Sequence, residues 1–125
     1  PVIANGDINN SEDARNCLQI TGANGVMIGR ASLRAPWVIG QIHAFLNGEK
    51  PIDDPQPKDR LIMAVEHLHN LLEKKGDHGL LLARKHFVWT CDGFEGASTL
   101  RHALVRANTP KEAINLLKEK ISTLN

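Results

Sequence analysis

The residues of this chain best suited to chemistry are two short polar groups, Asn5-Gly6-Asp7 and Gly29-Arg30. Gly6 and Gly29 carry no side chain, so an anion can come close to the backbone N–H groups beside them. The guanidinium of Arg30 can donate two parallel charged hydrogen bonds to phosphate oxygens. Asn, Gly and Asp are also common turn residues, and Asn5-Gly6-Asp7 alone would indicate a tight turn. Because Gly29-Arg30 follows the next strand, the two groups together predict a phosphate site.

The surrounding sequence predicts a strand–helix–strand unit that brings these groups to one place. Residues 1–4 and 25–28 are short apolar runs typical of buried strands. Ser11 is the predicted N-cap of the helix between them, and Gly22 is the predicted residue at its end. In a (β/α) barrel, the turns after the last two strands commonly form a phosphate site with the N-terminus of a short helix. Pro36 is then expected to open a further helix that ends at Asn47-Gly48.

A domain boundary is predicted in residues 48–57, which contain three prolines and three acidic residues. Beyond this linker, apolar residues at helical spacing predict helices that end at Gly76 and that cover about 80–90 and 97–107. The last helix has the clearest start signal, with Thr109 as N-cap, Pro110 next and Glu112 completing a capping box. Residues 58–125 therefore predict a small four-helix bundle.

The net charge of +1 says little, but its distribution along the chain is uneven. Between positions 79 and 107 the chain contains four basic residues and two histidines but only two acidic residues. The basic residues are Arg84, Lys85, Arg101 and Arg106, and one of the histidines is His86. A basic helical region fits a polyanion as partner. Charge alone is more typical of a solvated helical face, and both interpretations stay open at this point.

The cysteines and histidines predict no catalytic or metal site. Cys17 and Cys91 have neither metal-like spacing nor a disulfide framework, which favours a reducing, cytoplasmic setting. Cys91, near a helix end, is expected to be structural. His67 and His69 stand two apart on one predicted helix and so point in different directions. No apolar run has the length of a membrane span, and no signal peptide is visible.

Two stretches of the chain resemble a known family. PVIANGDI and TGANGVMIGRASLRAPWVIGQI look like the flavin-phosphate segment of the tRNA-dihydrouridine synthases, most like the bacterial B-type enzymes. The run LARKHFVW, residues 82–89, is similar to the ARKH…W stretch of their helical C-terminal domain. The resemblance covers essentially the whole chain. It implies an α/β plus all-α fold, with the last two β/α units of a flavin-binding TIM barrel in residues 1–47, the linker in 48–57 and a helical tRNA-binding domain in 58–125.

The resemblance also implies roles for individual residues. The matches to positions that bind flavin mononucleotide (FMN) are Asn5, Gly6, Asp7, Gly29 and Arg30. Because a carboxylate repels a phosphate dianion, Asp7 is expected to accept hydrogen bonds from backbone amides of its turn or to contact a ribityl hydroxyl. The ARKH segment implies tRNA contacts by Arg84, Lys85 and His86, while Arg101 and Arg106 are weaker candidates. Arg84 is also a candidate for bridging to the barrel, since its stem is long and apolar.

A full enzyme of this kind reduces uridine in tRNA to 5,6-dihydrouridine, with hydride from reduced FMN, NADPH as reductant and a cysteine as proton donor. The target base has to leave its stack to reach the flavin. The family's catalytic cysteine lies upstream of this segment, so neither cysteine here inherits that role. The chain is therefore expected to be an inactive C-terminal piece of a cytoplasmic, monomeric enzyme.

Two other functions fit the residues. One is a different barrel enzyme that binds FMN or a sugar phosphate in the same way, and the other is a non-catalytic RNA-binding helical module. The basic run Arg84-Lys85-His86 disfavours the first, because such an enzyme needs no basic helical appendage.

Overall fold

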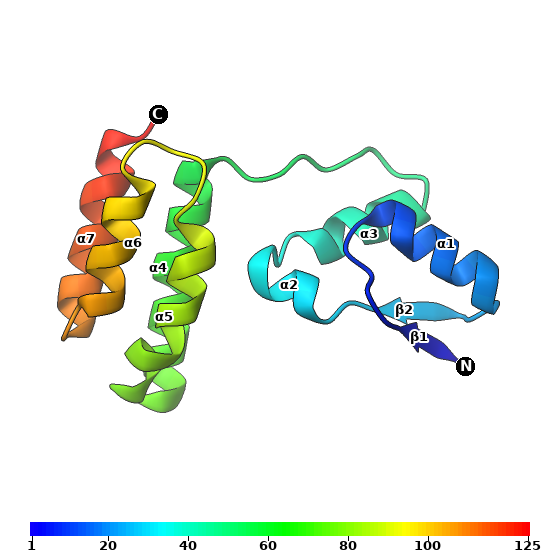
Figure 1. The fold of residues 1–125 in the computed structure, drawn as a ribbon, viewed down its shortest axis with the longest axis horizontal. Coiled ribbons are helices and arrows are strands. Elements are labelled where there is room, and N and C mark those ends of the chain that lie inside the picture. Colours follow the sequence, from blue (N-terminus) through cyan, green and yellow to red (C-terminus); the bar gives the residue numbers. More distant parts are fainter. The chain divides into compact units, whose positions relative to one another are not determined.

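The computed structural model describes all 125 residues, and the chain divides into two compact units, Pro1–Asp54 and Pro55–Asn125 (Figure 1). The division falls within the segment 48–57 that the sequence predicts to be a linker. None of the seven helices combines the length and apolar character needed to cross a bilayer.

The first unit contains two strands and three helices, which are β1 (Ile3–Asn5), α1 (Ser11–Thr21), β2 (Gly25–Met27), α2 (Arg30–Arg34) and α3 (Val38–Leu46). β1 and β2 pair in parallel, with Ala4 opposite Val26 and Asn5 opposite Met27. Helices α1 and α3 pack against each other, and the core consists of Ile8, Ala14, Val38 and Ile42. Because the paired strands are parallel and in register, the turns that follow them leave from the same edge.

The start of α1 differs by one residue from the sequence prediction. Asn10, not Ser11, is the N-cap, because its side-chain oxygen accepts a 2.9 Å hydrogen bond from the backbone N–H of Asp13. The carboxylate of Asp13 in turn accepts from the backbone N–H of Asn9 at 3.0 Å. At the other end, Gly22 adopts the left-handed conformation predicted for it, with φ of 67°.

The segment after β2 forms a short helix that starts at Arg30 and then a second helix, α3, that starts after Pro36. α2 begins at Arg30, immediately after Gly29, and the hydroxyl of Ser32 donates to the Gly29 carbonyl at 2.7 Å. Pro36 disfavours the helical conformation at the residue before it, and Ala35 is accordingly non-helical, with φ of −141° and ψ of 77°. The second polar group is therefore followed by a short extra helix.

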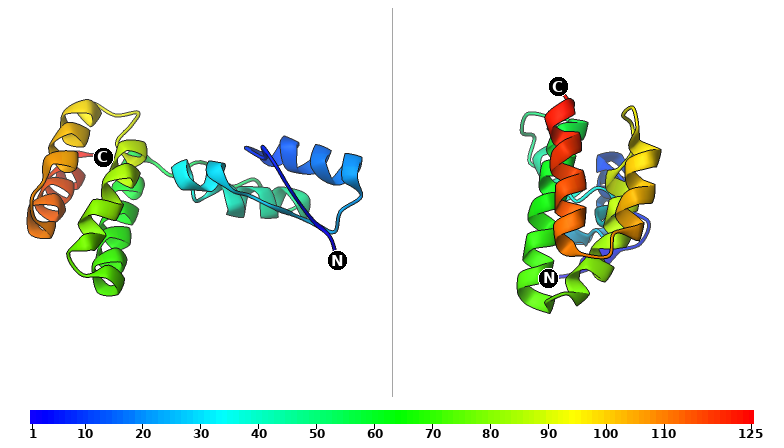
Figure 2. Two further views of the ribbon diagram at one scale, coloured as in Figure 1. Left: turned by 60° about the horizontal axis from the view of Figure 1, so that its bottom comes forward. Right: turned by 90° about the vertical axis from the view of Figure 1, so that its left-hand side faces the viewer.

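The second unit consists of four helices, α4 (Pro57–Lys75), α5 (His78–Thr90), α6 (Ala97–Arg106) and α7 (Pro110–Thr123) (Figure 2). α4 packs against α5 and α7, and α6 packs against α5 and α7. The fully buried side chains of greatest volume are Phe87, Leu61, Leu68, Leu104, Leu117 and Cys91. The four predicted helices are present, although α5 begins at His78, two residues earlier than expected.

The start of α7 carries the predicted cap in a shifted form. The Thr109 hydroxyl accepts from the backbone N–H of Glu112 at 3.2 Å. The Glu112 carboxylate accepts from the backbone N–H of Asn108, one residue before the cap, and not from Thr109 itself.

Helices α4 and α5 approach each other closely at Gly79. A Cβ added to Gly79 would lie 2.6 Å from the carbonyl carbon of Leu71 and 2.8 Å from the backbone nitrogen of Leu72. These are main-chain atoms of α4, which cannot rotate out of the way as a side chain can. Glycine at this position therefore sets how closely the two helices approach.

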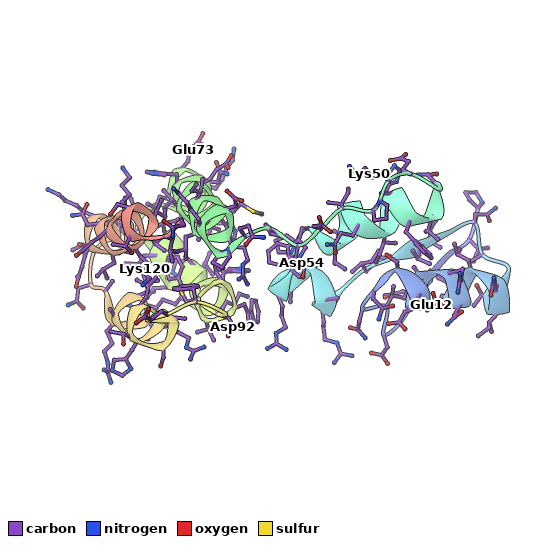
Figure 3. The ribbon with its side chains drawn as sticks, turned by 90° about the horizontal axis from the view of Figure 1, so that it is seen from above. Glu12, Lys50, Asp54, Glu73, Asp92 and Lys120 are labelled. Atoms are coloured by element: carbon purple, nitrogen blue, oxygen red, sulfur yellow. The ribbon has the colours of Figure 1, made fainter.

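We expect Gly79→Ala to destabilise the second unit by about 1–3 kcal/mol through overpacking, which exceeds the gain in helix propensity. Glu73→Ala is the control, because Glu73 lies exposed on α4 and points away from the helices (Figure 3). Denaturant unfolding measures both variants. A Gly79→Ala midpoint equal to that of Glu73→Ala would contradict the close approach.

Candidate functional site

The five predicted phosphate-site residues line one cavity of about 390 Å³ between the turns after β1 and β2. We call Asn5, Gly6, Asp7, Gly29 and Arg30 together the phosphate cradle. Residues more than twenty positions apart in sequence meet here because the two strands pair in parallel. The prediction that the two polar groups lie side by side is therefore confirmed.

The turn after β1 has an unusual backbone. Gly6 has φ of 135° and Asp7 has φ of 49°, so two successive residues have positive φ. A side chain at Gly6 would be strained at that φ, whereas Asp is among the few other residues that tolerate the left-handed conformation. Ile8 follows at once and is 4% exposed, which anchors the turn to the core. The side-chain amide of Asn9 donates to the Asp7 backbone carbonyl at 3.2 Å.

Arg30 and Asp7 join the two turns. Nη2 of Arg30 lies 2.8 Å from Oδ1 of Asp7, and the two side chains are 88% and 84% exposed. The Asp7 carboxylate thus accepts from the Arg30 guanidinium, and no backbone amide of its turn donates to it. The alternative expectation, a contact with a ribityl hydroxyl, stays a prediction. An ion pair this exposed contributes about 0–1 kcal/mol, so it can orient Arg30 without locking it.

Positive charge at the cradle comes from a side chain and not from a helix. α2 starts at the cradle but contains only five residues, so few peptide dipoles add along its axis. Arg30 is its first residue and carries a full charge. The cradle can therefore bind an anion through Arg30 and the N–H groups of its turns.

A larger cavity of about 650 Å³ lies in the same unit, along α3 and the segment that follows it. The Gln41 amide holds that segment by donating to the Ile52 carbonyl at 3.1 Å and to the Asp54 carboxylate at 2.8 Å. The lining contains Glu49 and Asp54 but no Lys or Arg. This charge does not suit a phosphate, so the smaller cradle is the better candidate.

Arg84 makes a structural hydrogen bond within the second unit. It is half-buried, and its Nη2 donates to the carbonyl of Ala107, the residue that ends α6, at 3.0 Å. This bond gives Arg84 a partner within its own unit, and a bridge from Arg84 to the barrel stays a prediction. Lys85 and Arg106, the neighbours of the bonded residues, are exposed.

The remaining predicted RNA residues have mixed surroundings. His86 is half-buried in a row of rings, with the His67 centroid 4.6 Å and the Trp89 centroid 5.5 Å away in edge-on geometry. The contact between His67 and His86 joins α4 to α5 and was not predicted from the sequence. Arg101 is half-buried near Cys91. RNA binding by all five residues stays a prediction.

Cys91 lacks the properties of a nucleophile. Its side chain is fully buried, and this burial raises the pKa of the thiol to about 11, although the positive charges of Arg101 and Arg60 oppose the shift. The thiol is therefore neutral at physiological pH, whereas the thiolate is the reactive form. No group of three His, Cys, Asp or Glu side chains is arranged to hold a metal ion.

Comparison with known proteins decides the family. The whole chain, residues 1–125, matches the sequence model described as dihydrouridine synthase (Dus). The chain belongs to the dihydrouridine synthase family. The resemblance found in the sequence is thus confirmed, and the parallel strands and helices of the first unit are compatible with part of the family's TIM barrel.

Several curated proteins are similar to the chain over nearly all of its length. It is 48% identical over 124 residues to the probable tRNA-dihydrouridine synthase 1 of Synechocystis, covering 98% of this chain and 35% of that protein. It is 37% identical to the probable tRNA-dihydrouridine synthase of Rickettsia conorii, covering 98% and 36%. It is 33% identical to tRNA-dihydrouridine synthase B of Xanthomonas axonopodis pv. citri, covering 99% and 38%. The chain spans about a third of the length of these relatives.

We expect alkylation of the native protein at pH 8 to modify Cys17 and to spare Cys91. Cys17 is half-buried, whereas Cys91 is both inaccessible and protonated at this pH. Mass spectrometry after brief iodoacetamide treatment locates the label, and treatment in denaturant should label both residues. Equal labelling of the two cysteines in the native protein would contradict the buried position of Cys91.

Proposed function

We propose that this chain is the C-terminal part of a flavin-dependent tRNA-dihydrouridine synthase, and that the phosphate cradle binds the phosphate of FMN. The observation that carries the proposal is the meeting of Asn5-Gly6-Asp7 with Gly29-Arg30 around one cavity. Reduced FMN, when bound, would supply the hydride that converts uridine to 5,6-dihydrouridine, and NADPH would serve as reductant. The proton donor, a cysteine in this family, belongs to the upstream part of the barrel, so this chain alone should be inactive.

The donor set of the cradle fits a phosphate monoester. Gly6 lacks a Cβ and has a backbone conformation that other residues avoid, so an oxygen can approach the main chain there. The guanidinium of Arg30 is a cation with five N–H donors. One of them, on Nη2, donates to Oδ1 of Asp7. The remaining donors can bind phosphate oxygens. FMN with its phosphate at the ends of two barrel strands matches where such barrels hold phosphates.

The second unit is more basic than the first. Residues 55–125 contain eleven Lys and Arg against eight Asp and Glu, whereas residues 1–54 contain four against six. The hydrogen bond between Arg84 and the Ala107 carbonyl joins α5 to the end of α6. Lys85 and Arg106, which are next to these two residues in the sequence, are both exposed. We infer that these side chains contact tRNA phosphates, whose recognition depends mainly on charge and shape.

The cradle alone would also fit another barrel enzyme that binds FMN or a sugar phosphate. The basic second unit and the names of the relatives support the synthase. A cytoplasmic, monomeric enzyme without metal is the form we propose for the full-length protein.

In a full-length protein that contains this sequence, Arg30→Ala should weaken FMN binding by about 1.5–3 kcal/mol, the range for a hydrogen bond to a charged group. Arg34→Ala is the matched control, because Arg34 is an exposed arginine of the same short helix that does not line the cradle. Fluorescence titration of the apoprotein with FMN measures both affinities. Equal FMN affinity in the two variants would remove the support for the cradle.

Replacing Lys85 and Arg106 together with Gln should weaken tRNA binding and lower the slope of log K against log salt by about one to two units, because fewer counterions are released. The control replaces Lys74 and Lys75, two exposed basic residues in the last turn of α4, with Gln. Titrations at several salt concentrations give the slopes, and FMN content should stay constant. Indistinguishable slopes for the two double variants would contradict a specific role for Lys85 and Arg106.

A further inference from the structure

We propose that Asp7 is a positioning residue that holds the guanidinium of Arg30 at the cradle. The inference rests on the proposed function, since it concerns how the same site presents its cation to a phosphate. The role belongs to the Asp7 carboxylate, which would act on the phosphate through Arg30, and it is separate from the backbone N–H groups of the turn, which can bind the phosphate themselves. The carrying observation is the 2.8 Å ion pair between the turns after β1 and β2.

The geometry lets Asp7 orient Arg30 and leaves other N–H donors of the guanidinium available for a phosphate. The contact joins Oδ1 of Asp7 to Nη2 of Arg30, and this is the bond that links the two side chains. Arginine has five N–H donors in a rigid, planar group, so a bond at Nη2 restricts the directions in which the other donors point. A phosphate can therefore bind to the free donors while the carboxylate stays on Nη2.

Charge argues against Asp7 as a direct phosphate ligand. An ionised carboxylate only accepts hydrogen bonds, and a phosphate dianion offers it nothing but like charge. With Arg30 between them, each anion meets the cation. An order of carboxylate, guanidinium and phosphate is the arrangement in which no two like charges are adjacent.

The residue type supports a role for the carboxylate itself. Asp7 lies in the left-handed region, with φ of 49°, directly after Gly6. Asn tolerates this conformation as well as Asp does, and Gly tolerates it better. The backbone therefore does not require a negative charge at this position, whereas pairing with Arg30 does.

The test measures the affinities of FMN and of riboflavin, which lacks the phosphate, for the full-length protein. Four forms make a double-mutant cycle, namely the unchanged protein, Asp7→Asn, Arg30→Ala and the double variant. Asp7→Asn keeps the left-handed conformation and an acceptor oxygen but removes the charge. Asp7→Gly checks the backbone, because it removes the side chain without introducing strain. Riboflavin binding shows whether each variant retains its fold.

We expect Asp7→Asn and Asp7→Gly each to weaken FMN binding about two- to fivefold, the range for an exposed ion pair, and to leave riboflavin affinity unchanged. In the Arg30→Ala background, Asp7→Asn should have no further effect. The inference is overturned if Asp7→Asn leaves FMN affinity unchanged or raises it. It is also overturned if the loss persists without Arg30, because Asp7 would then contact the cofactor directly.

The same cycle separates this inference from the proposed function. If Arg30→Ala leaves the ratio of FMN to riboflavin affinity unchanged, the cradle does not bind the phosphate, and both ideas fail. If Arg30→Ala lowers that ratio but the Asp7 variants do not, the cradle stands and only the positioning role fails.

Discussion

The parallel pairing of β1 with β2 is the constraint on which the candidate site depends. The register sets Asn5 opposite Met27, so the two strands end at the same edge of the sheet and the turns that follow them enclose one cavity. A shift of this register by one residue would reverse the faces of the side chains and move the turns apart. The bonds from the Asn24 and Gly25 backbone N–H groups to the Val2 carbonyl, at 2.8 and 3.3 Å, help to fix it.

Sequence patterns predicted the helices and strands well where local rules decide the outcome, and they predicted that the two polar groups meet. Gly22 ends α1 as expected because a left-handed residue is needed there, and the short apolar runs led to the two strands. The strands are less buried than predicted, because Ile3 and Met27 are more than half exposed. The cradle residues were found from their types and their positions after two strands. The start of α1 was misplaced by one residue, since Ser11 and Asn10 are both good N-caps and only geometry chooses between them.

The contacts that the sequence did not predict join distant residues, and local patterns do not contain such contacts. The pairing of Asp7 with Arg30 depends on strand register, and the contact of Arg84 with Ala107 depends on how α5 lies beside the end of α6. The closeness of α4 and α5 at Gly79 could have been suspected, because a glycine inside a helix often has a packing reason. The row of rings formed by His67, His86 and Trp89 could not have been predicted from local patterns, because its members come from two helices.

The most direct test of the central claim is a crystal structure of the full-length protein with FMN bound. The account predicts phosphate oxygens roughly 2.7–2.9 Å from the guanidinium nitrogens of Arg30, with the phosphate also against the turns at Gly6 and Gly29. An FMN phosphate bound elsewhere, with Arg30 directed to solvent or to Asp7 alone, would contradict it.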